Sequence, residues 1–162
     1  MAQDYVAAFV RDGSRCYIAN LDTRVDLLSW GGHVLPITIN DGLKPGTFVC
    51  SARVGYIDYT LEELRHFPDP KLAALLGIVV KAVGPMLSLC DIDRIMHVNN
   101  WMMSTNLPVD LDPDLVPDRT ADLVSRFPRH VLAMRSLSLR YSGVLMAALS
   151  GAGWALPPCR QN

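Results

Sequence analysis

The chain has 162 residues, of which 50% are hydrophobic, so it is long and apolar enough to bury a core, and disorder is not expected. Its formal net charge is -1 at pH 7, with acids and bases mixed along the chain, which argues against a nucleic-acid-binding surface. The four cysteines lie far apart, without a Cys-x-x-Cys or His-x-x-x-His pair, so no metal site is expected.

The N-terminus shows no targeting signal. Residues 1–5 contain neither the basic nor the apolar region of a signal peptide, so we expect a cytoplasmic protein with reduced thiols. No repeat, low-complexity tract or linker interrupts the sequence, which predicts a single domain over residues 1–162.

The first sixty residues predict an antiparallel meander of short strands. Gly31-Gly32 can supply the positive φ angles of a tight hairpin turn, and Asp12-Gly13-Ser14 is another turn signal. The expected strands are the apolar runs at residues 5–10, 16–20, 25–30, 33–39 and 47–54.

Helices are expected after residue 59. Thr60 and Glu63 have the spacing of a capping box, which predicts a short helix beginning at Thr60. The apolar segment 72–89 has hydrophobic residues at helical spacing and a face of small residues. Lys81 and Pro85 make its insertion into a membrane close to neutral at best, so we expect a buried helix and no transmembrane segment. Peripheral association of this helix with a membrane is a minor alternative.

The remaining sequence alternates strands and helices. Pro117 suits the first turn of a helix and Gly153 suits a helix C-cap. The expected order is strand 94–98, helix 117–127, strand 130–137 and helix 141–150. The chain is therefore expected to have an α/β (α+β) fold, with an antiparallel meander followed by alternating helices and strands on a mixed sheet.

A dense polar segment follows the strand 94–98. Ligands of open α/β sheets lie at the carboxyl ends of strands, so this segment is our candidate binding pocket. Its side chains are His97, Asn99, Asn100, Trp101, Ser104, Thr105 and Asn106. In the alternative interpretation these polar groups close turns, Trp101 packs in the core and His97 is structural.

Arg135 ends the next expected strand and would lie beside the same opening. It could bind a carboxylate or phosphate through two hydrogen bonds, or it could pair with a structural acid. The acids Asp58, Asp91 and Asp93 have no partner that the sequence identifies, so the catalytic residue is unknown. Gly-x-Ser-x-Gly, P-loop and Gly-x-Gly-x-x-Gly motifs do not occur.

The end segment, with helix 118–127, strand 131–137, helix 141–150 and Gly153-Trp154, resembles the acyl-CoA N-acyltransferase superfamily, the GNAT-like fold. It is similar in particular to the N-terminal lobe of two-lobed acyltransferases related to the Fem-type enzymes. The resemblance implies transfer of an acyl group from a CoA thioester to an amine acceptor by direct attack. Acyl-CoA would then be a co-substrate rather than a tightly bound cofactor.

The resemblance also suggests roles for the polar segment. Trp101 would form the pocket wall and Arg135 would bind an anion. The hydrogen-bonding groups would be Asn99, Asn100, Ser104 and Asn106, and His97 would be a further substrate-binding residue. The glycine-rich loop with which such enzymes hold the CoA pyrophosphate is missing, because residues 99–116 contain no glycine and four aspartates lie between Asp110 and Asp118.

A different class of function stays open. Few residues follow Trp154, whereas such a fold normally completes its sheet with a further hairpin. An open sheet edge is usually covered. The alternative is therefore a non-catalytic binding or assembly domain, or a truncated remnant, whose edge pairs with a second lobe or another copy of the chain.

Overall fold

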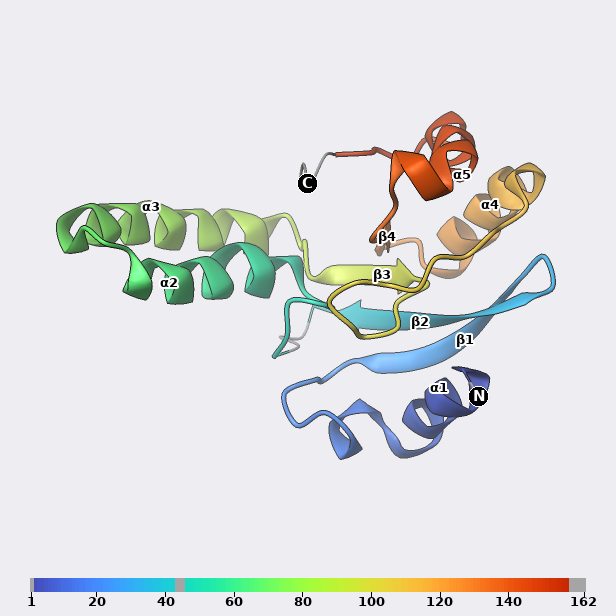
Figure 1. Cartoon of the computed structure of the whole chain (residues 1–162), viewed down its shortest axis with the longest axis horizontal. Coiled ribbons are helices and arrows are strands. Elements are labelled where there is room, and N and C mark those ends of the chain that lie inside the picture. The colour runs from blue at the N-terminus through green and yellow to red at the C-terminus, as the bar shows by residue number, and fades with distance from the viewer. Residues whose placement is uncertain (1, 43–45, 158–162) are drawn as a thin grey trace.

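The computed structural model describes residues 2–42 and 46–157 and has a mixed α/β architecture (Figure 1). Its four-stranded sheet has the order β1-β2-β3-β4. The strands are β1 (Arg24–Trp30), β2 (His33–Asp41), β3 (Arg94–Val98) and β4 (Val131–Met134). The pairs β1–β2 and β2–β3 are antiparallel, and β4 pairs with β3 in parallel. The expected mixed sheet is confirmed.

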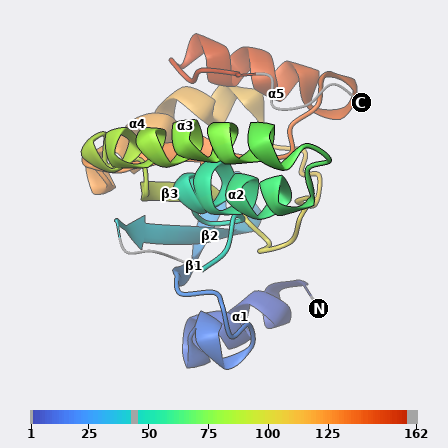
Figure 2. The ribbon, with the colours of Figure 1, turned by 90° about the vertical axis from the view of Figure 1, so that its left-hand side faces the viewer.

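Helices cover both faces of this sheet. The described residues form five α-helices, α1 (Ala2–Asp12), α2 (Tyr59–Glu63), α3 (Pro70–Leu89), α4 (Val116–Arg126) and α5 (Leu139–Gly151). Figure 2 shows α1 below the sheet and α4 and α5 above it. This layering follows from β2 and β3, which are buried on both faces.

Two hydrophobic clusters hold the layers together. Ile37 and Met96 belong to the cluster that packs against α4 and α5, whereas Val25 belongs to the cluster on the α1 side. Successive side chains of a strand point to opposite faces, and β1 accordingly contributes Leu28 and Trp30 to the first cluster and Val25 to the second, whereas the residues of β2 and β3 in these clusters belong to the first. The sheet is the common wall of the two cores.

The β1–β2 hairpin and the C-terminal elements agree with the sequence. Gly31 and Gly32 adopt φ angles of 54° and 84°, and Trp30 faces His33 across the two-residue turn. Helix α5 ends in a Schellman motif, in which Trp154 N donates to Leu149 O at 3.0 Å and Gly153 has a φ of 90°. Strand β4 is shorter than the expected strand 130–137.

Three expected strands are wrong. Residues 5–10 lie in α1, because Val6 and Phe9, one helical turn apart, share a buried face. Cys16 ends a short 3₁₀ turn, Ser14–Cys16, that residues 17–20 follow without a strand. Residues 47–50 form a bend and turns, and the chain becomes helical from residue 52 and enters the π-helical turn Val54–Asp58. The meander is therefore limited to β1, β2 and β3.

The capping box at Thr60 is also wrong. The backbone is already helical at Asp58, with φ -67° and ψ -43°, and the π-helical turn Val54–Asp58 runs directly into α2. Thr60 consequently lies inside a continuous helical segment. The unpaired amides that a capping hydroxyl would bind occur only at the beginning of a helix, so Thr60 does not act as an N-cap.

Helix α3 exists as expected, but it is not buried. It forms, with α2, an arm that projects from the sheet (Figure 1). We call residues 54–89 the arm. In the window Pro70–Leu87 the mean hydropathy is 1.5 and 6% of the residues are buried, so α3 is long and apolar enough to cross a membrane by these measures alone. The apolar face of α3 could be recognised from the sequence. Its exposure could not, because the sequence pattern does not reveal whether another part of the chain covers the face.

A buried hydrogen bond joins the two ends of the arm. Ser51 Oγ donates to Asp93 Oδ1 at 2.6 Å, and the Arg53 amide donates to the same oxygen at 3.2 Å. Ser51 and Asp93 are both buried. The chain therefore leaves the sheet and returns to it at one point.

Candidate functional site

The carboxyl ends of β3 and β4 lie at the same end of the sheet because these two strands are parallel. The loop after β3 and the turn after β4 meet there. Asn106 N donates to Ser136 Oγ at 3.0 Å, and Arg135 Nη2 donates to Met103 O at 2.9 Å. Topology thus brings together the two polar segments that the sequence singled out.

Asn100 joins this loop to the rest of the sheet. Its side chain is fully buried, and Nδ2 donates to Thr38 Oγ1 at 2.8 Å and to Val49 O at 3.0 Å. Its Oδ1 accepts from Met102 N at 3.2 Å and from Arg135 Nη2 at 3.4 Å. Because every polar atom of this amide has a partner, Asn100 positions the site.

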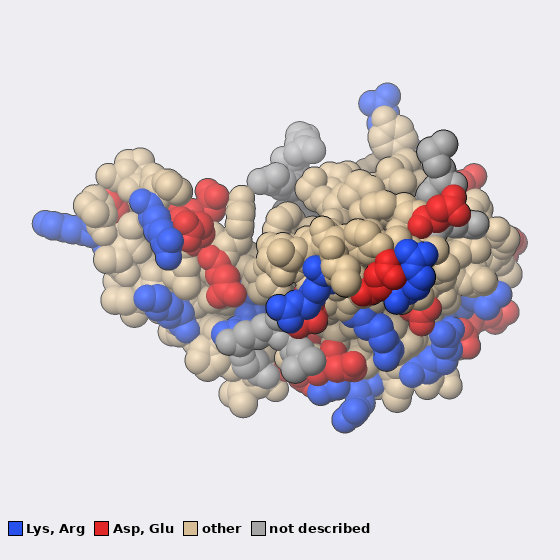
Figure 3. Space-filling model, turned by 90° about the horizontal axis from the view of Figure 1, so that it is seen from below, with Lys and Arg blue, Asp and Glu red and all other residues tan. Residues whose placement is uncertain are grey.

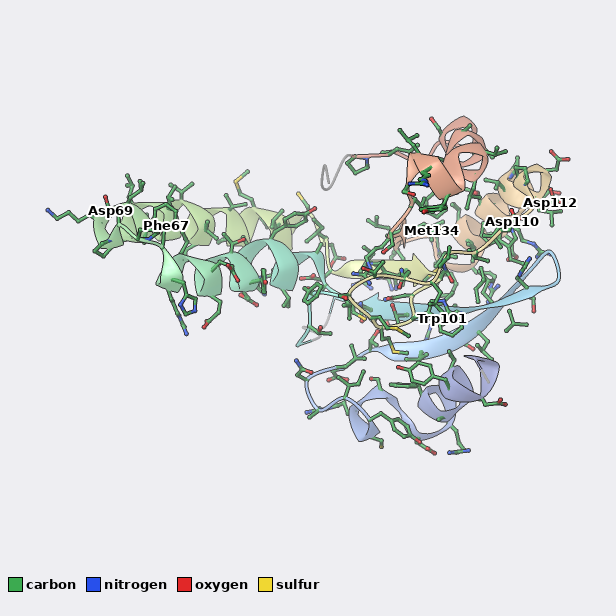
Figure 4. The ribbon with its side chains drawn as sticks, in the orientation of Figure 1. Phe67, Asp69, Trp101, Asp110, Asp112 and Met134 are labelled. Carbon is green, nitrogen blue, oxygen red and sulfur yellow. The ribbon has the colours of Figure 1, made fainter. Side chains whose placement is uncertain are left out.

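Asn99 and Trp101 form one wall of an adjacent cleft. Trp101 Nε1 donates to Asn99 Oδ1 at 2.8 Å, and Asn99 Nδ2 donates to Leu107 O at 2.9 Å. The cleft has a volume of about 290 Å³ and lies between this loop and the end of the β1–β2 hairpin, where Gly32 and His33 line it. Figure 4 places Trp101 at this end of the sheet.

His97 lies in the interior of the α1 side of the sheet. It faces Thr38 of β2 and Ala133 of β4 in the strand register, and 5% of its surface is exposed. Burial, and secondarily the positive charge of Arg135, lower the pKa of His97 to about 4. The imidazole is therefore neutral at physiological pH.

Among the described residues, three buried nitrogen atoms at this end of the sheet lack a hydrogen-bond partner. Within the described part of the chain, His97 Nδ1, Asn106 Nδ2 and Arg135 Nε have no hydrogen-bond partner. Most buried polar atoms in proteins are paired, so a group of unpaired ones indicates a place for a ligand or a water molecule. Positive φ angles at Asn99, Met102 and Ser136 add local backbone strain around the same point.

Other expected site residues lie apart from this cluster. Ser104 and Thr105 are exposed on the loop. Trp101 packs against the α1-side core, as in the alternative interpretation, while it also lines the cleft. Trp101 thus has both a structural role in the core and a role in forming the cleft.

Sequence reasoning missed two members of the cluster. Thr38 interrupts an apolar strand, and only the β2–β3 register brings it opposite His97. Cys50 is fully buried with Sγ 3.6 Å from Asn100 Nδ2, and burial raises the pKa of its thiol. Thr38 could have been recognised as a candidate because it is a polar residue within an apolar strand. No feature of the sequence marks Cys50 as part of the site.

The start of α4 is unsuited to a phosphate group. Asp112 Oδ1 accepts a hydrogen bond from Asp114 N at 3.0 Å, so a carboxylate already occupies that amide. Pro113 and Pro117 have no amide hydrogen. Asp110 and Asp112 lie near α4 (Figure 4), and they would repel an anion. Elsewhere, lysines and arginines are interspersed with acids across the face in Figure 3.

No family model, curated protein or solved structure matches this chain. A function must therefore be inferred from the chemistry of the site.

Proposed function

We propose that this chain is an acyltransferase-like domain with GNAT-like topology that binds a small acyl or amine compound at the carboxyl ends of β3 and β4. One observation carries the proposal. Because β3 and β4 are parallel, the buried nitrogen atoms of His97, Asn106 and Arg135, unpaired within the described residues, lie at the same end of the sheet. Ligands of α/β sheets bind at this position.

The C-terminal elements support the same proposal. The order α4, β4, α5, Gly153-Trp154 is the order on which the GNAT-like resemblance rests. Trp154 Nε1 donates to Thr120 Oγ1 at 3.0 Å and so joins the end of α5 to α4. Trp154, the aromatic residue of the Gly153-Trp154 pair, thereby contacts α4, the helix that precedes β4.

The chemistry of the unused atoms suggests the ligand class. Asn106 Nδ2 and Arg135 Nε are hydrogen-bond donors, so the ligand should present acceptor oxygens, such as those of an acyl carbonyl or a carboxylate. In the transfer, the amine nitrogen attacks the thioester carbonyl carbon, a C–N bond forms, the C–S bond breaks, and the amine proton is transferred to the sulfur. His97, neutral and weakly basic, would orient the carbonyl rather than accept the proton.

Titration calorimetry with acetyl-CoA, a long-chain acyl-CoA and free CoA tests this function. We expect the acyl compounds to bind, Arg135→Gln to weaken binding several-fold, and the exposed control Arg129→Gln to leave it unchanged. Release of the CoA thiol in the presence of an amine would demonstrate transfer. No binding of these ligands at millimolar concentration would contradict the proposal.

An assembly domain is the second candidate, and the position of β4 favours it. In the described sheet β4 pairs with β3 alone and forms an edge, and Val131 is 52% exposed. Such an edge is a template for a further strand. Val131→Lys should then reduce self-association measured by light scattering, and a wild-type monomer at all concentrations would exclude pairing of this edge between copies.

A further inference from the structure

The strongest unexplained feature outside the site is the exposed face of α3. Helix α3 contacts α2 and the π-helical turn before it through small residues: a Cβ at Gly77 would lie 3.9 Å from Leu61 Cδ2, and one at Gly84 would lie 4.0 Å from Ile57 Cγ2. The larger apolar side chains of α3 lie on the other side of the helix, because 3.6 residues make one turn. They therefore point away from the rest of the arm.

Five of these exposed residues, together with the exposed Ala82, follow a regular pattern. They occur at alternating spacings of three and four, the spacing with which two helices pack knobs into holes, and Leu76, Ile78 and Val83 flank them. We call them the seam, which consists of Leu72, Leu75, Val79, Ala82, Met86 and Leu89. Leu75 is 59% exposed, Met86 64% and Leu89 87%.

We propose that the seam pairs in antiparallel orientation with the seam of a second copy of this chain. The spacing reads the same from both ends, about a midpoint between Val79 and Ala82. A two-fold axis there would place Leu75 opposite Met86 of the partner subunit, and Val79 opposite Ala82 of the partner subunit. The side chains of Val79 and Ala82, which are shorter than those of the flanking Leu75 and Met86, would then meet at the centre of the pair.

The charges of α3 fit this arrangement. The seam itself contains no charged residue, and Lys81 lies outside it. In an antiparallel pair, Lys71 at the start of α3 lies beside the C-terminal end of the partner helix. That end carries the negative pole of the helix dipole, so the lysine stabilises the pair.

The size of the apolar face also suits a dimer rather than a membrane. Eight aliphatic side chains of α3, including Ile78 and Val83, are between 37% and 87% exposed. Together they offer an area on the order of the roughly 800 Å² per partner that a stable interface buries. Insertion of the arm into a bilayer would instead require the burial of Lys81 and of the acids Glu62 and Glu63 of α2.

Charge substitutions in the seam test both pairing and orientation. Sedimentation velocity of the full chain, over the micromolar range, should show a dimer. Leu75→Glu combined with Met86→Glu places like charges opposite each other and should give monomers. Leu75→Glu combined with Met86→Lys places opposite charges together only in an antiparallel pair, so this variant should dimerise again.

A control variant shows whether the seam itself holds the dimer together. Lys81→Glu changes the charge of α3 outside the seam, so this variant should remain a dimer. All seam substitutions lie at exposed positions, and circular dichroism spectra should match the wild type. A monomeric wild type, a dimeric double-glutamate variant, or a monomer that co-sediments with phosphatidylcholine vesicles would overturn the proposal.

Discussion

The side-chain amide of Asn100 donates a 2.8 Å hydrogen bond to Thr38 Oγ1 and thereby joins the loop after β3 to the middle of β2. The same amide nitrogen reaches Val49 O. One side chain therefore connects three segments that are distant in the sequence.

Replacement of this amide should destabilise the fold. We expect Asn100→Ala to lower the free energy of unfolding by about 3 kcal/mol, because Thr38 Oγ1 and Val49 O lose a buried partner. Chemical denaturation measures the change. Ser104→Ala, an exposed control on the same loop, should change it by less than about 0.5 kcal/mol. Equal effects of the two substitutions would contradict the structural role of Asn100.

Acid should destabilise the chain through His97. The pKa of this side chain is about 4 in the folded chain against an ordinary value of 6.5, so the unfolded state takes up the proton first as the pH falls. The stabilisation is present above pH 6.5 and is lost towards pH 4, by up to about 3 kcal/mol. Urea denaturation at several pH values should show this slope, and His97→Gln should flatten it between pH 6.5 and 5.

Arg135 contributes to the low pKa of His97, after burial. Arg135→Gln removes the positive charge and keeps a hydrogen-bonding side chain of related shape. We therefore expect the pKa of His97 to rise in this variant but to stay below 6.5, because the imidazole remains buried. Nuclear magnetic resonance of the imidazole protons during a pH titration follows the change. An unchanged or lower pKa would show that the guanidinium does not act on His97.

Gly46 and Gly143 should respond in opposite ways to alanine. A Cβ at Gly46 would lie 2.5 Å from the backbone oxygen of Asn20, so Gly46→Ala should cost about 1 to 3 kcal/mol. A Cβ at Gly143, within α5, would meet nothing within 4 Å. Gly143 directly follows a kink at Ser142 (φ -131°, ψ 19°), and Gly143→Ala should stabilise the chain by about 0.4 to 1 kcal/mol because alanine restricts the unfolded chain more than glycine does. Thermal melting of both variants checks the two signs.

The parts of the fold that follow from local signals could be predicted from the sequence. Gly31-Gly32 specifies its own turn, and Pro117 and Gly153 mark helix ends. Residues 5–10 were mispredicted because a short apolar run suits a buried strand as well as a helix, and only the contacts of Val6 and Phe9 decide between them.

The candidate site shows the same limit. The cluster from Asn99 to Asn106 could be located because its residues are consecutive and follow a strand. Thr38 and Cys50 could not, since they come near Asn100 only through strand pairing and the return of the chain after β2. The expected burial of α3 was wrong because an apolar face has the same sequence pattern whether its partner is in the same chain or elsewhere.

The hydrogen bond between Ser51 and Asp93 makes the arm a separable insertion. Both crossings between sheet and arm pass through this one buried contact, so the register of β2 and β3 is fixed without the helices beyond it. The length and surface of α2 and α3 can therefore diverge during evolution while the hairpin, the parallel strands and the polar edge are retained. The surface of the arm and the polar residues at the end of the sheet are therefore free to change independently.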